Sequence, residues 1–360
     1  MQSIHQFVAG FAQRDAVSNE ALVMKSIFRS WGFRSEIYSE SNRVRPESRK
    51  FTKDISEYDS DANSNDIILL HLSTGSRIND YFAELPCKKA ILYHNMTPSH
   101  YYDDIEYKTA YLLAKGRSQL KYLVNTATVN MTCSKYSADE LIKLGYRDIK
   151  VLPLMIDFKN LLSKPDRKTL RQFDNGKINI LFVGRCAPNK KIEDAISAFT
   201  LFNKTVERNS RFIHAGSLLG AEQYYFRLLA NIKKLGINNI HFTGIVTQPQ
   251  LTALYKCADI FLCMSEHEGF CIPIIESMIH DVPVMAYSAA AVPETMDGAG
   301  ILFKDKNFEL IAEMMGKLIN DSTFKTAVLR KQRERVERFT ARNLETELKE
   351  HLKPLLNTAL

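Results

Sequence analysis

The chain has 360 residues, of which 45% are hydrophobic and 25% charged, and its formal net charge is +7. This length suffices for two domains of ordinary size, and the composition excludes a disordered or fibrous protein. No apolar run reaches the ~18 residues of a membrane-spanning helix, and Arg14 and Asp15 interrupt the N-terminal apolar stretch where a signal peptide would need to continue. We therefore expect a cytoplasmic globular protein whose basic charge favours anionic partners.

Cysteine spacing gives no sign of a disulfide scaffold or a zinc site. Cys-x-x-Cys pairs, which both kinds of site commonly use, do not occur in this sequence. We expect reduced and mostly buried thiols. The six cysteines are Cys87, Cys133, Cys186, Cys257, Cys263 and Cys271.

In the first half of the chain, short apolar runs alternate with longer helical patterns, which is typical of a parallel sheet covered by helices. A first helix is expected to begin with Ser18 as its N-cap and to end at Gly32. Its buried face is expected to carry Leu22, Val23, Ile27 and Trp31. The expected strands are 4–8, 67–72, 90–94, 129–133 and 150–154.

A polar stretch over 157–177, closed by an Asp-Asn-Gly turn signal, predicts a linker. A second series of strands follows, so the fold class is α/β with two Rossmann-like halves in tandem. The tail, 307–360, predicts two or three charged amphipathic helices. The strands of this second half are expected at 178–183, 212–215, 240–242, 260–264 and 282–287.

The most informative segment, 265–278, directly follows the strand at 260–264 and reads SEHEGFCIPIIESM. Gly269 suits a tight turn, and Pro273 suits the first position of a helix. Free backbone amides at that helix start form an anion site at the carboxyl edge of a sheet. Glu268 is predicted in the turn and Glu276 about one turn further into the helix. The two carboxylates can therefore face one ligand, with Glu276 lying deeper than Glu268. The alternative is that Glu276 merely favours the helix start and Glu268 is solvated.

A basic loop follows the strand at 178–183, in the segment FVGRCAPNKK. Arg185 offers a planar fork of donors and Lys190 a point charge, which together suit a diphosphate leaving group. Spacing favours Lys190 over its neighbour Lys191 for this role. The alternative is a solvated basic loop without a ligand.

These two segments resemble family 4 of the retaining glycosyltransferases, the glycosyl transferases group 1. The Glu-x7-Glu motif runs from Glu268 to Glu276 inside the pattern E-G-F-x-x-P-x-x-E-x-M, and G-R-x4-K begins at Gly184. Cys271 stands where many members have Gly. The resemblance implies a GT-B fold, in which two Rossmann-like domains with parallel sheets face each other across a cleft. The implied domains are an acceptor-side domain over 1–160, a nucleotide-sugar domain over 175–335 and a terminal helix over 336–360 that crosses back.

By this resemblance, Glu276 binds the ribose hydroxyls, Glu268 contacts the donor sugar, and Arg185 with Lys190 stabilises the departing diphosphate. Retention without an evident protein nucleophile implies front-face attack, with the leaving phosphate accepting the acceptor's proton. The whole donor-binding set implied is Arg185, Lys190, Glu268, Gly269, Phe270, Cys271, Ile272 and Glu276.

Two weaker matches in the first half resemble a polysaccharide and O-antigen subgroup of the family. His94, in the segment YHNMTP, would lie near the transferred sugar as a hydrogen-bond donor or orienting group, which gives His94, Glu268, Arg185 and Lys190 as the catalytic set. A structural role is the alternative for a histidine at a strand end. Asp15 and Asn19 resemble the G-D-A-x-x-N variant and would touch the acceptor, with helix capping as the alternative.

The resemblance implies a retaining, metal-independent hexosyltransferase without a cofactor, acting on a GDP- or UDP-linked sugar. Mannose from GDP-mannose is favoured, with a saccharide or lipid-linked acceptor in surface polysaccharide synthesis.

The Asp-x-Asp spelling at 59–61 is interpreted as a loop and not as a metal site. Dispersed Lys and Arg argue against nucleic acid. A basic stretch over 108–121 suggests peripheral contact with the inner face of the membrane, with a solvated helix face as the alternative. A catalytically silent subunit that binds a partner or membrane is the alternative function.

Overall fold

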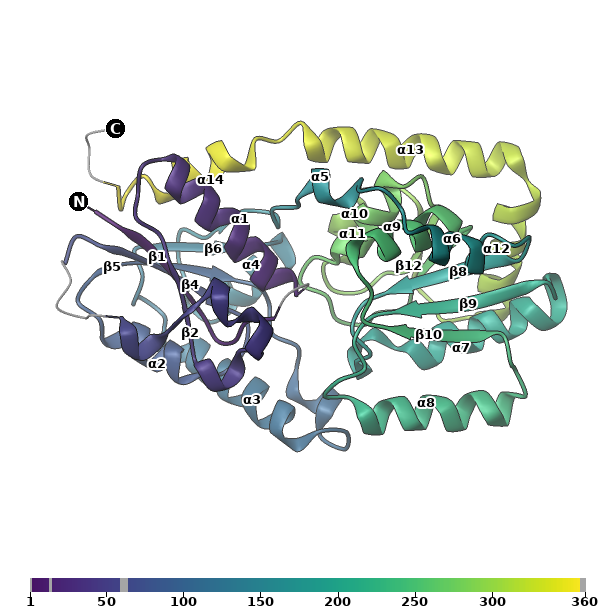
Figure 1. The fold of residues 1–360 in the computed structure, drawn as a ribbon, viewed down its shortest axis with the longest axis horizontal. Coiled ribbons are helices and arrows are strands. Elements are labelled where there is room, and N and C mark those ends of the chain that lie inside the picture. Colours follow the sequence, from purple (N-terminus) through teal and green to yellow (C-terminus); the bar gives the residue numbers. More distant parts are fainter. Residues whose placement is uncertain (1, 13–14, 59–63, 357–360) are drawn as a thin grey trace. The chain divides into compact units, whose positions relative to one another are not determined.

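A computed structural model describes residues 2–12, 15–58 and 64–356 of the chain. The chain forms two compact units, labelled by element in Figure 1. The N-terminal unit comprises Met1–His100, Lys108–Ile156 and Asn343–Leu360, and the C-terminal unit comprises Tyr101–Tyr107 and Asp157–Arg342. Among the described residues, no helix is both long and apolar enough to cross a lipid bilayer.

The N-terminal unit is built on a seven-stranded parallel sheet with the strand order β3-β2-β1-β4-β5-β6-β7. The direction of strand addition reverses between β1 and β4, and such reversal points are where open α/β sheets bind ligands, at their carboxyl ends. The strands are β1 (Ile4–Val8), β2 (Ile37–Ser39), β3 (Lys53–Asp54), β4 (Ile67–Leu72), β5 (Lys88–Tyr93), β6 (Val129–Thr132) and β7 (Lys150–Val151).

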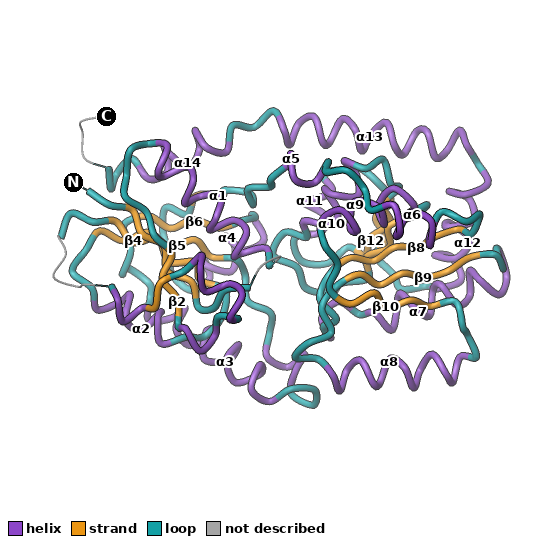
Figure 2. Tube along the Cα trace, viewed as in Figure 1, coloured by secondary structure: helices purple, strands orange, loops and turns teal. Residues whose placement is uncertain are grey.

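Helices cover both faces of this sheet, because successive side chains of each strand point to opposite sides. On one face, Ile67 and Leu69 of β4 pack in a core with Phe28 of α1 and Leu348 of α14. On the other face, Ile68 and Leu70 pack with side chains of α2, α3 and α4. Figure 2 shows α1 and α14 along one side of the strands and α2 and α3 along the other. The α-helices are α1 (Ala16–Ser30), α2 (Arg77–Glu84), α3 (Tyr107–Tyr122), α4 (Lys135–Lys143) and α14 (Leu344–Leu352). Short 3-10 helices lie at Ser41–Arg43, Pro46–Phe51, Ile55–Glu57 and Ser99–Tyr102.

The start and the buried face of α1 differ from the sequence prediction. The N-cap is Asp15, whose carboxylate accepts a hydrogen bond from the backbone N–H of Ser18, so Ser18 lies inside the helix. The buried positions are 18, 20, 21, 24 and 28, whereas Leu22, Val23, Ile27 and Trp31 are only partly buried. The prediction failed because apolar residues occur on two adjacent faces of this helix, so periodicity alone could not choose between them.

The C-terminal unit has a six-stranded parallel sheet in the order β10-β9-β8-β11-β12-β13. Its reversal point lies between β8 and β11, which are hydrogen-bonded neighbours. The strands are β8 (Ile178–Val183), β9 (Ser210–Ala215), β10 (Ile240–Gly244), β11 (Ile260–Cys263), β12 (Val284–Tyr287) and β13 (Ile301–Phe303). The helices are α5 (Phe158–Leu161), α6 (Arg167–Phe173), α7 (Ile192–Leu201), α8 (Glu222–Leu235), α9 (Gln248–Cys257), α10 (Ile272–Ile279), α11 (Val292–Met296), α12 (Phe308–Asn320) and α13 (Ser322–Thr340), with a 3-10 turn at Pro188–Lys190 and a π-helical turn at Phe202–Val206.

The segment 157–177, predicted to be a linker, is instead part of the C-terminal unit. It contains α5 and α6, and the backbone N–H of Asp166 donates to the carbonyl of Pro249 at 2.8 Å, which joins the segment to α9. Strands β2, β3 and β13 were also absent from the prediction. Each has only two or three residues, too few to give an alternating pattern.

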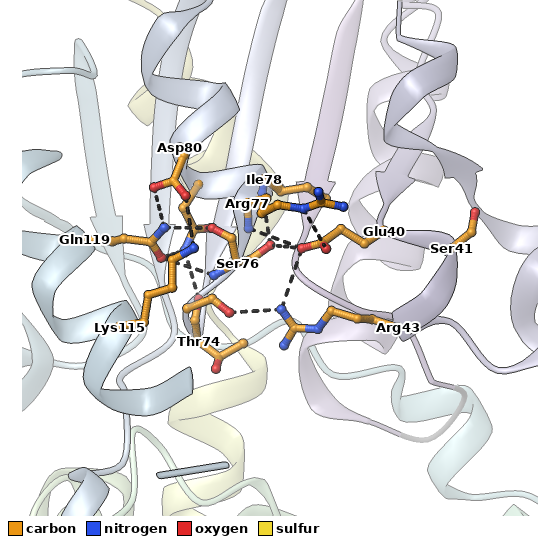
Figure 3. A network of polar contacts seen from close by, with 12 residues as sticks. Glu40, Ser41, Arg43, Thr74, Ser76, Arg77, Ile78, Asp80, Lys115 and Gln119 are labelled. Atoms are coloured by element: carbon orange, nitrogen blue, oxygen red, sulfur yellow. Dashed lines mark hydrogen bonds and ion pairs between the residues drawn. The ribbon is translucent and has the colours of Figure 1, made fainter. Parts of the chain in front are cut away.

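A buried polar network orders the loop that follows β4 (Figure 3). The Ser76 hydroxyl, which is also the N-cap of α2, donates to the Glu40 carboxylate at 2.6 Å. The Gln119 amide accepts from the backbone N–H of Ser76 and donates to its carbonyl, and Arg43 Nη1 donates to the carbonyl of Gly75 at 2.9 Å. These bonds hold the loop against α3 so closely that a Cβ at Gly75 would lie 2.4 Å from the carbonyl oxygen of Leu112.

We expect Gly75→Ala to destabilise the chain by about 1–3 kcal/mol, because the contacted atoms are backbone and cannot rotate away. Gly316→Ala is the matched comparison: its added Cβ would lie 2.6 Å from a terminal methyl of the exposed Val206 side chain, which can turn away as a backbone atom cannot, and alanine favours the helix. The measurement is thermal unfolding of both variants. Equal stability of the two would contradict the close packing of the loop on α3.

Candidate functional site

The loop from β11 to α10 carries the Glu-x7-Glu segment at the carboxyl edge of the C-terminal sheet. Cys271 immediately precedes α10 with φ 72°, in the left-handed region that favours glycine. The sequence analysis assigned the tight turn to Gly269, but Gly269 is not among the positive-φ glycines. The strained position is therefore Cys271, which is the position where glycine is common in the resembling family.

Lys190 and Glu268 form an ion pair across the β8–β11 reversal point. The Lys190 ammonium lies 2.6 Å from both carboxylate oxygens of Glu268, and the Glu268 residue is buried. Burial acts to lower the pKa of Lys190, but the adjacent Glu268 carboxylate outweighs it and holds that pKa above its ordinary value. Of the alternatives in the sequence analysis, a solvated Glu268 is therefore wrong.

Backbone and side-chain bonds fasten the two loops that carry this pair. The backbone N–H of Glu266 donates to the carbonyl of Asn189 at 2.9 Å, and the Asn189 side-chain amide donates to the carbonyl of His267 at the same distance. Asn189 is itself buried. The position of Lys190 relative to Glu268 is thus fixed by three interactions and not by the ion pair alone.

Lys191 belongs to a second charged cluster, which the sequence analysis missed. Its ammonium lies 3.5 Å from Glu266, and Lys306 lies 2.6 Å from both Glu266 and Asp194. Tyr101 OH donates to Glu266 at 3.3 Å. The structure therefore gives the two adjacent lysines different carboxylate partners, Glu268 for Lys190 and Glu266 for Lys191. Which of them holds a diphosphate stays a prediction. Lys306 is remote in sequence, and no motif marked it.

Arg185 and Glu276 lie on either side of the ion pair in the sequence, and each has a tyrosine partner. Arg185 is exposed on the loop after β8, where its Nη2 lies 3.4 Å from Tyr102 OH. The Glu276 carboxylate, on α10, accepts a hydrogen bond from Tyr255 OH at 2.6 Å. Burial raises the pKa of Glu276 above its ordinary value. An exposed guanidinium can bind an anion without first breaking a buried contact.

Glu268 also lies close to two thiols that could join it in holding a metal. One ligand atom each from Cys263, Glu268 and Cys271 lies within 4.8 Å of the others, and the two sulfurs are 4.0 Å apart. However, the Lys190 ammonium already neutralises Glu268 at 2.6 Å. The donor set therefore fits an ion pair better than a dication, which would have to displace the ammonium.

In the N-terminal unit, the His94 side chain is buried and each of its ring nitrogens faces another polar side chain. Its Nε2 lies 2.9 Å from His71 Nδ1, and its Nδ1 lies 3.5 Å from Glu20 Oε2. Asp15 caps α1, as the alternative reading allowed, and Asn19 is exposed in the first turn of that helix. An acceptor role for either remains a prediction. The Asp-x-Asp spelling at 59–61 lies outside the described residues.

Comparison with known proteins finds one family model on this chain, described as glycosyl transferases group 1, over residues 164–340. The serotype-specific mannosyltransferase WbdA of Escherichia coli is 26% identical over 145 residues, which cover 40% of this chain and 18% of that protein. O-antigen chain mannosyltransferase B of Escherichia coli is 23% identical over 167 residues, covering 46% of this chain and 43% of that protein. The matched segment thus spans less than half the length of either relative.

Solved structures extend the similarity to nearly the whole chain. The HepE protein of Anabaena in complex with UDP-glucose has a TM-score of 0.76 at 17% identity, covering 98% of this chain and 100% of that one. Sucrose-phosphate synthase from Thermosynechococcus elongatus has a TM-score of 0.74 at 14% identity, covering 99% of both chains. At such identities the similarity concerns the fold, and it confirms the predicted two-domain GT-B architecture.

Proposed function

Because this chain is a group 1 glycosyltransferase with the GT-B fold, we propose that it transfers a hexose from a nucleotide sugar to a saccharide or lipid-linked acceptor. The observation that carries the proposal is the Lys190–Glu268 pair at the β8–β11 reversal point. A ligand site at the carboxyl edge of this sheet is where the fold class binds nucleotides. The pair and the exposed Arg185 are contributed by the loops after β8 and β11, and the partly buried Glu276 is contributed by α10.

In this proposal the two cationic side chains bind the leaving diphosphate and stabilise its negative charge. Arg185 binds it through its guanidinium, and Lys190 shares its ammonium between the phosphate and Glu268. Without Lys190, the buried Glu268 carboxylate would repel a diphosphate. Glu268 then accepts from a hydroxyl of the donor sugar, and Glu276 accepts from the ribose. The anomeric configuration is retained by front-face attack, in which the leaving phosphate takes the acceptor's proton.

GDP-mannose is the proposed donor, and surface polysaccharide synthesis is the proposed setting. Two of the relatives are named as mannosyltransferases, one of them for the O-antigen chain, and this supports mannose. A UDP-linked sugar is the second candidate, supported by the complex of the structural neighbour HepE with UDP-glucose. The proposed reaction uses no metal, since Arg185 and Lys190 supply the charge that a metal would otherwise give the diphosphate.

Binding of nucleoside diphosphates tests the proposal. GDP, UDP, ADP and dTDP are compared, each at about 100 times its dissociation constant or at its solubility limit. At about 100 times the dissociation constant, a ligand that binds only the folded protein raises the free energy of unfolding by about 2.7 kcal/mol. We expect one diphosphate, GDP first, to raise the midpoint of thermal unfolding.

Arg185→Ala is expected to abolish most of that shift, whereas Arg208→Ala, which removes another exposed arginine of the same unit, is expected to leave it unchanged. The readout is the difference in unfolding midpoint with and without each diphosphate. A folded wild-type protein that none of the four stabilises would favour the catalytically silent subunit instead.

A further inference from the structure

Four polar side chains form a buried chain inside the N-terminal unit. Gln6 comes from β1, Glu20 from α1, His71 from β4, and His94 follows β5. The first three are at most 1% exposed, and the His94 side chain is 4% exposed. Burying this many polar groups is costly unless each proton has one acceptor. The position of each proton can therefore be assigned one residue at a time, starting from Gln6.

The Gln6 amide sets the direction at that end. Its Nε2 donates to the carbonyl of Ala21 at 3.0 Å, so its Oε1 is the atom facing His71 Nε2 at 2.9 Å. A carbonyl oxygen only accepts. His71 Nε2 therefore carries the proton.

The proton position on His71 determines the proton position on His94. Burial and the neighbouring His94 hold the pKa of His71 well below its ordinary value, so the ring is neutral and its Nδ1 is an acceptor. The atom facing that acceptor at 2.9 Å is His94 Nε2, which must donate. Burial lowers the pKa of His94 to about 3, so this ring is neutral as well, and its Nδ1 holds a lone pair.

Glu20 faces that lone pair. Glu20 Oε1 accepts from the backbone N–H of Met155 at 3.1 Å, while Oε2 lies 3.5 Å from His94 Nδ1. Both Glu20 Oε2 and His94 Nδ1 are buried and neither makes a hydrogen bond of ordinary geometry, so each is the nearest group that could satisfy the other. An ionised carboxylate would bring two acceptors together, whereas a carboxylic acid donates its proton and satisfies both atoms.

We propose that Glu20 is a neutral carboxylic acid that donates to His94 Nδ1, and that it is a positioning residue which fixes the Nε2–H tautomer of His94. Through this chain His94 is held as a neutral ring with both nitrogens occupied. In the transfer reaction, His94 then acts as a neutral ring of fixed position. It supplies neither a positive charge nor a free N–H. This last step rests on the proposed function, whereas the proton positions do not.

The surroundings of Glu20 agree with the neutral form. Burial raises the pKa of Glu20 to about 8, with the Met155 N–H acting weakly in the other direction. The neighbouring Cys133 thiol also stays neutral, since burial, with Glu20 adding to it, raises its pKa to about 12. The titratable groups facing Glu20 are thus His94, with His71 behind it, and Cys133. The same carboxyl and imidazole atoms lie within 4.8 Å of one another, so a bound dication is the competing interpretation.

Glu20→Gln is the decisive variant, because a glutamine reproduces the protonated acid: its amide donates to His94 Nδ1 and its carbonyl accepts from Met155. Nitrogen-15 NMR of the full chain at pH 7 is expected to show both His71 and His94 protonated at Nε2 only, in the wild type and in Glu20→Gln. An imidazolium at His94 in the wild type, or a stoichiometric metal in the purified protein, would overturn the proposal.

The pH dependence of stability gives a second readout that requires no substrate. An acid whose folded pKa is about 8 and whose unfolded pKa is about 4.5 binds its proton more tightly in the folded state. Its contribution to stability is complete below the unfolded value and is lost as pH rises to about 8. The buried histidines, with lowered pKa, act in the opposite direction and only below about 6.5.

We therefore expect the stability of the wild type relative to Glu20→Gln to fall between pH 6.5 and 8. Glu47→Gln, an exposed acid in the same unit, is the control and should follow the wild type. Wild-type and Glu20→Gln curves that run parallel over this range would contradict the neutral acid.

Activity separates this inference from the proposed function. The wild type is expected to lose kcat/KM above about pH 8, as Glu20 ionises, and Glu20→Gln is expected to keep it. Expected NMR and stability results without any transferase activity would refute the proposed function alone. Equal alkaline loss in both proteins would refute the positioning role.

Discussion

Lys190→Ala is expected to lower kcat/KM for sugar transfer by roughly 10²–10³-fold, about 2.7–4 kcal/mol of transition-state stabilisation. Lys190 is the cation held 2.6 Å from Glu268, and its removal takes a positive charge from the leaving diphosphate. It also leaves Glu268 buried and unpaired beside an anionic ligand. Steady-state kinetics with varied donor concentration measure the loss.

Lys191→Ala provides the matched control for this prediction. The two lysines are adjacent, but Lys191 pairs with Glu266, which is also held by Lys306. Its removal is expected to change kcat/KM by less than about tenfold, since Glu266 keeps one cation. An equal loss in both variants would show that net positive charge matters and that the Glu268 partnership does not.

Loss of folding must be distinguished from loss of catalysis in Lys190→Ala. Breaking a fully buried ion pair from one side costs about 3–5 kcal/mol, because the remaining charge is uncompensated. The cost is expected to be smaller here, because the Lys190 side chain is 21% exposed. The double variant Lys190→Ala with Glu268→Gln removes that charge. We expect it to unfold near the wild-type temperature and to remain inactive. Recovery of activity in the double variant would contradict a direct role for Lys190.

Glu276→Gln is expected to raise the dissociation constant of the nucleoside diphosphate by roughly 10–100-fold, because a hydrogen bond to a charged acceptor contributes about 1.5–3 kcal/mol. Glu276 is the carboxylate proposed to accept from the ribose, and it already accepts from Tyr255 at 2.6 Å. Calorimetric titration with the diphosphate measures the change.

Tyr255→Phe separates ribose binding from packing of α10. It removes the hydroxyl that orients Glu276 but keeps the buried ring, so we expect a loss of affinity of only a few fold. If Tyr255→Phe weakened binding as much as Glu276→Gln, the carboxylate would act through its tyrosine partner and not on the ribose.

The longer strands and the loops that carry the two sequence motifs were predictable from the sequence. The shortest strands and the helices of polar composition were not. Strands β1, β4 and β8 lie where their short runs rich in apolar residues placed them. The buried face of α1 was missed because apolar residues occur on two adjacent faces, and Glu20 on the buried one gave no apolar signal, since a charged residue is ordinarily assigned to solvent. The helices α5 and α6 were missed because their composition is that of a polar linker.

The candidate site shows the same division. The spacing from Glu268 to Glu276 identified the loop, whereas the ion pair between Lys190 and Glu268 was not predicted, because the two residues are 78 positions apart. Lys306 carries no local signal, because its partners come from segments 40 and 112 residues away. The chain of Gln6, Glu20, His71 and His94 was likewise hidden, since only the sheet order β1-β4-β5 and the packing of α1 on that sheet bring its members together.

We propose that the loops after β8 and β11 hold a nucleotide sugar for transfer. The test of this claim is release of nucleoside diphosphate from GDP-mannose, with UDP-glucose in parallel, in the presence and absence of oligosaccharide acceptors. We predict diphosphate release by the wild type with one donor, its loss in Lys190→Ala and its persistence in Lys191→Ala. Folded wild-type protein that binds neither donor and releases no diphosphate would contradict the claim.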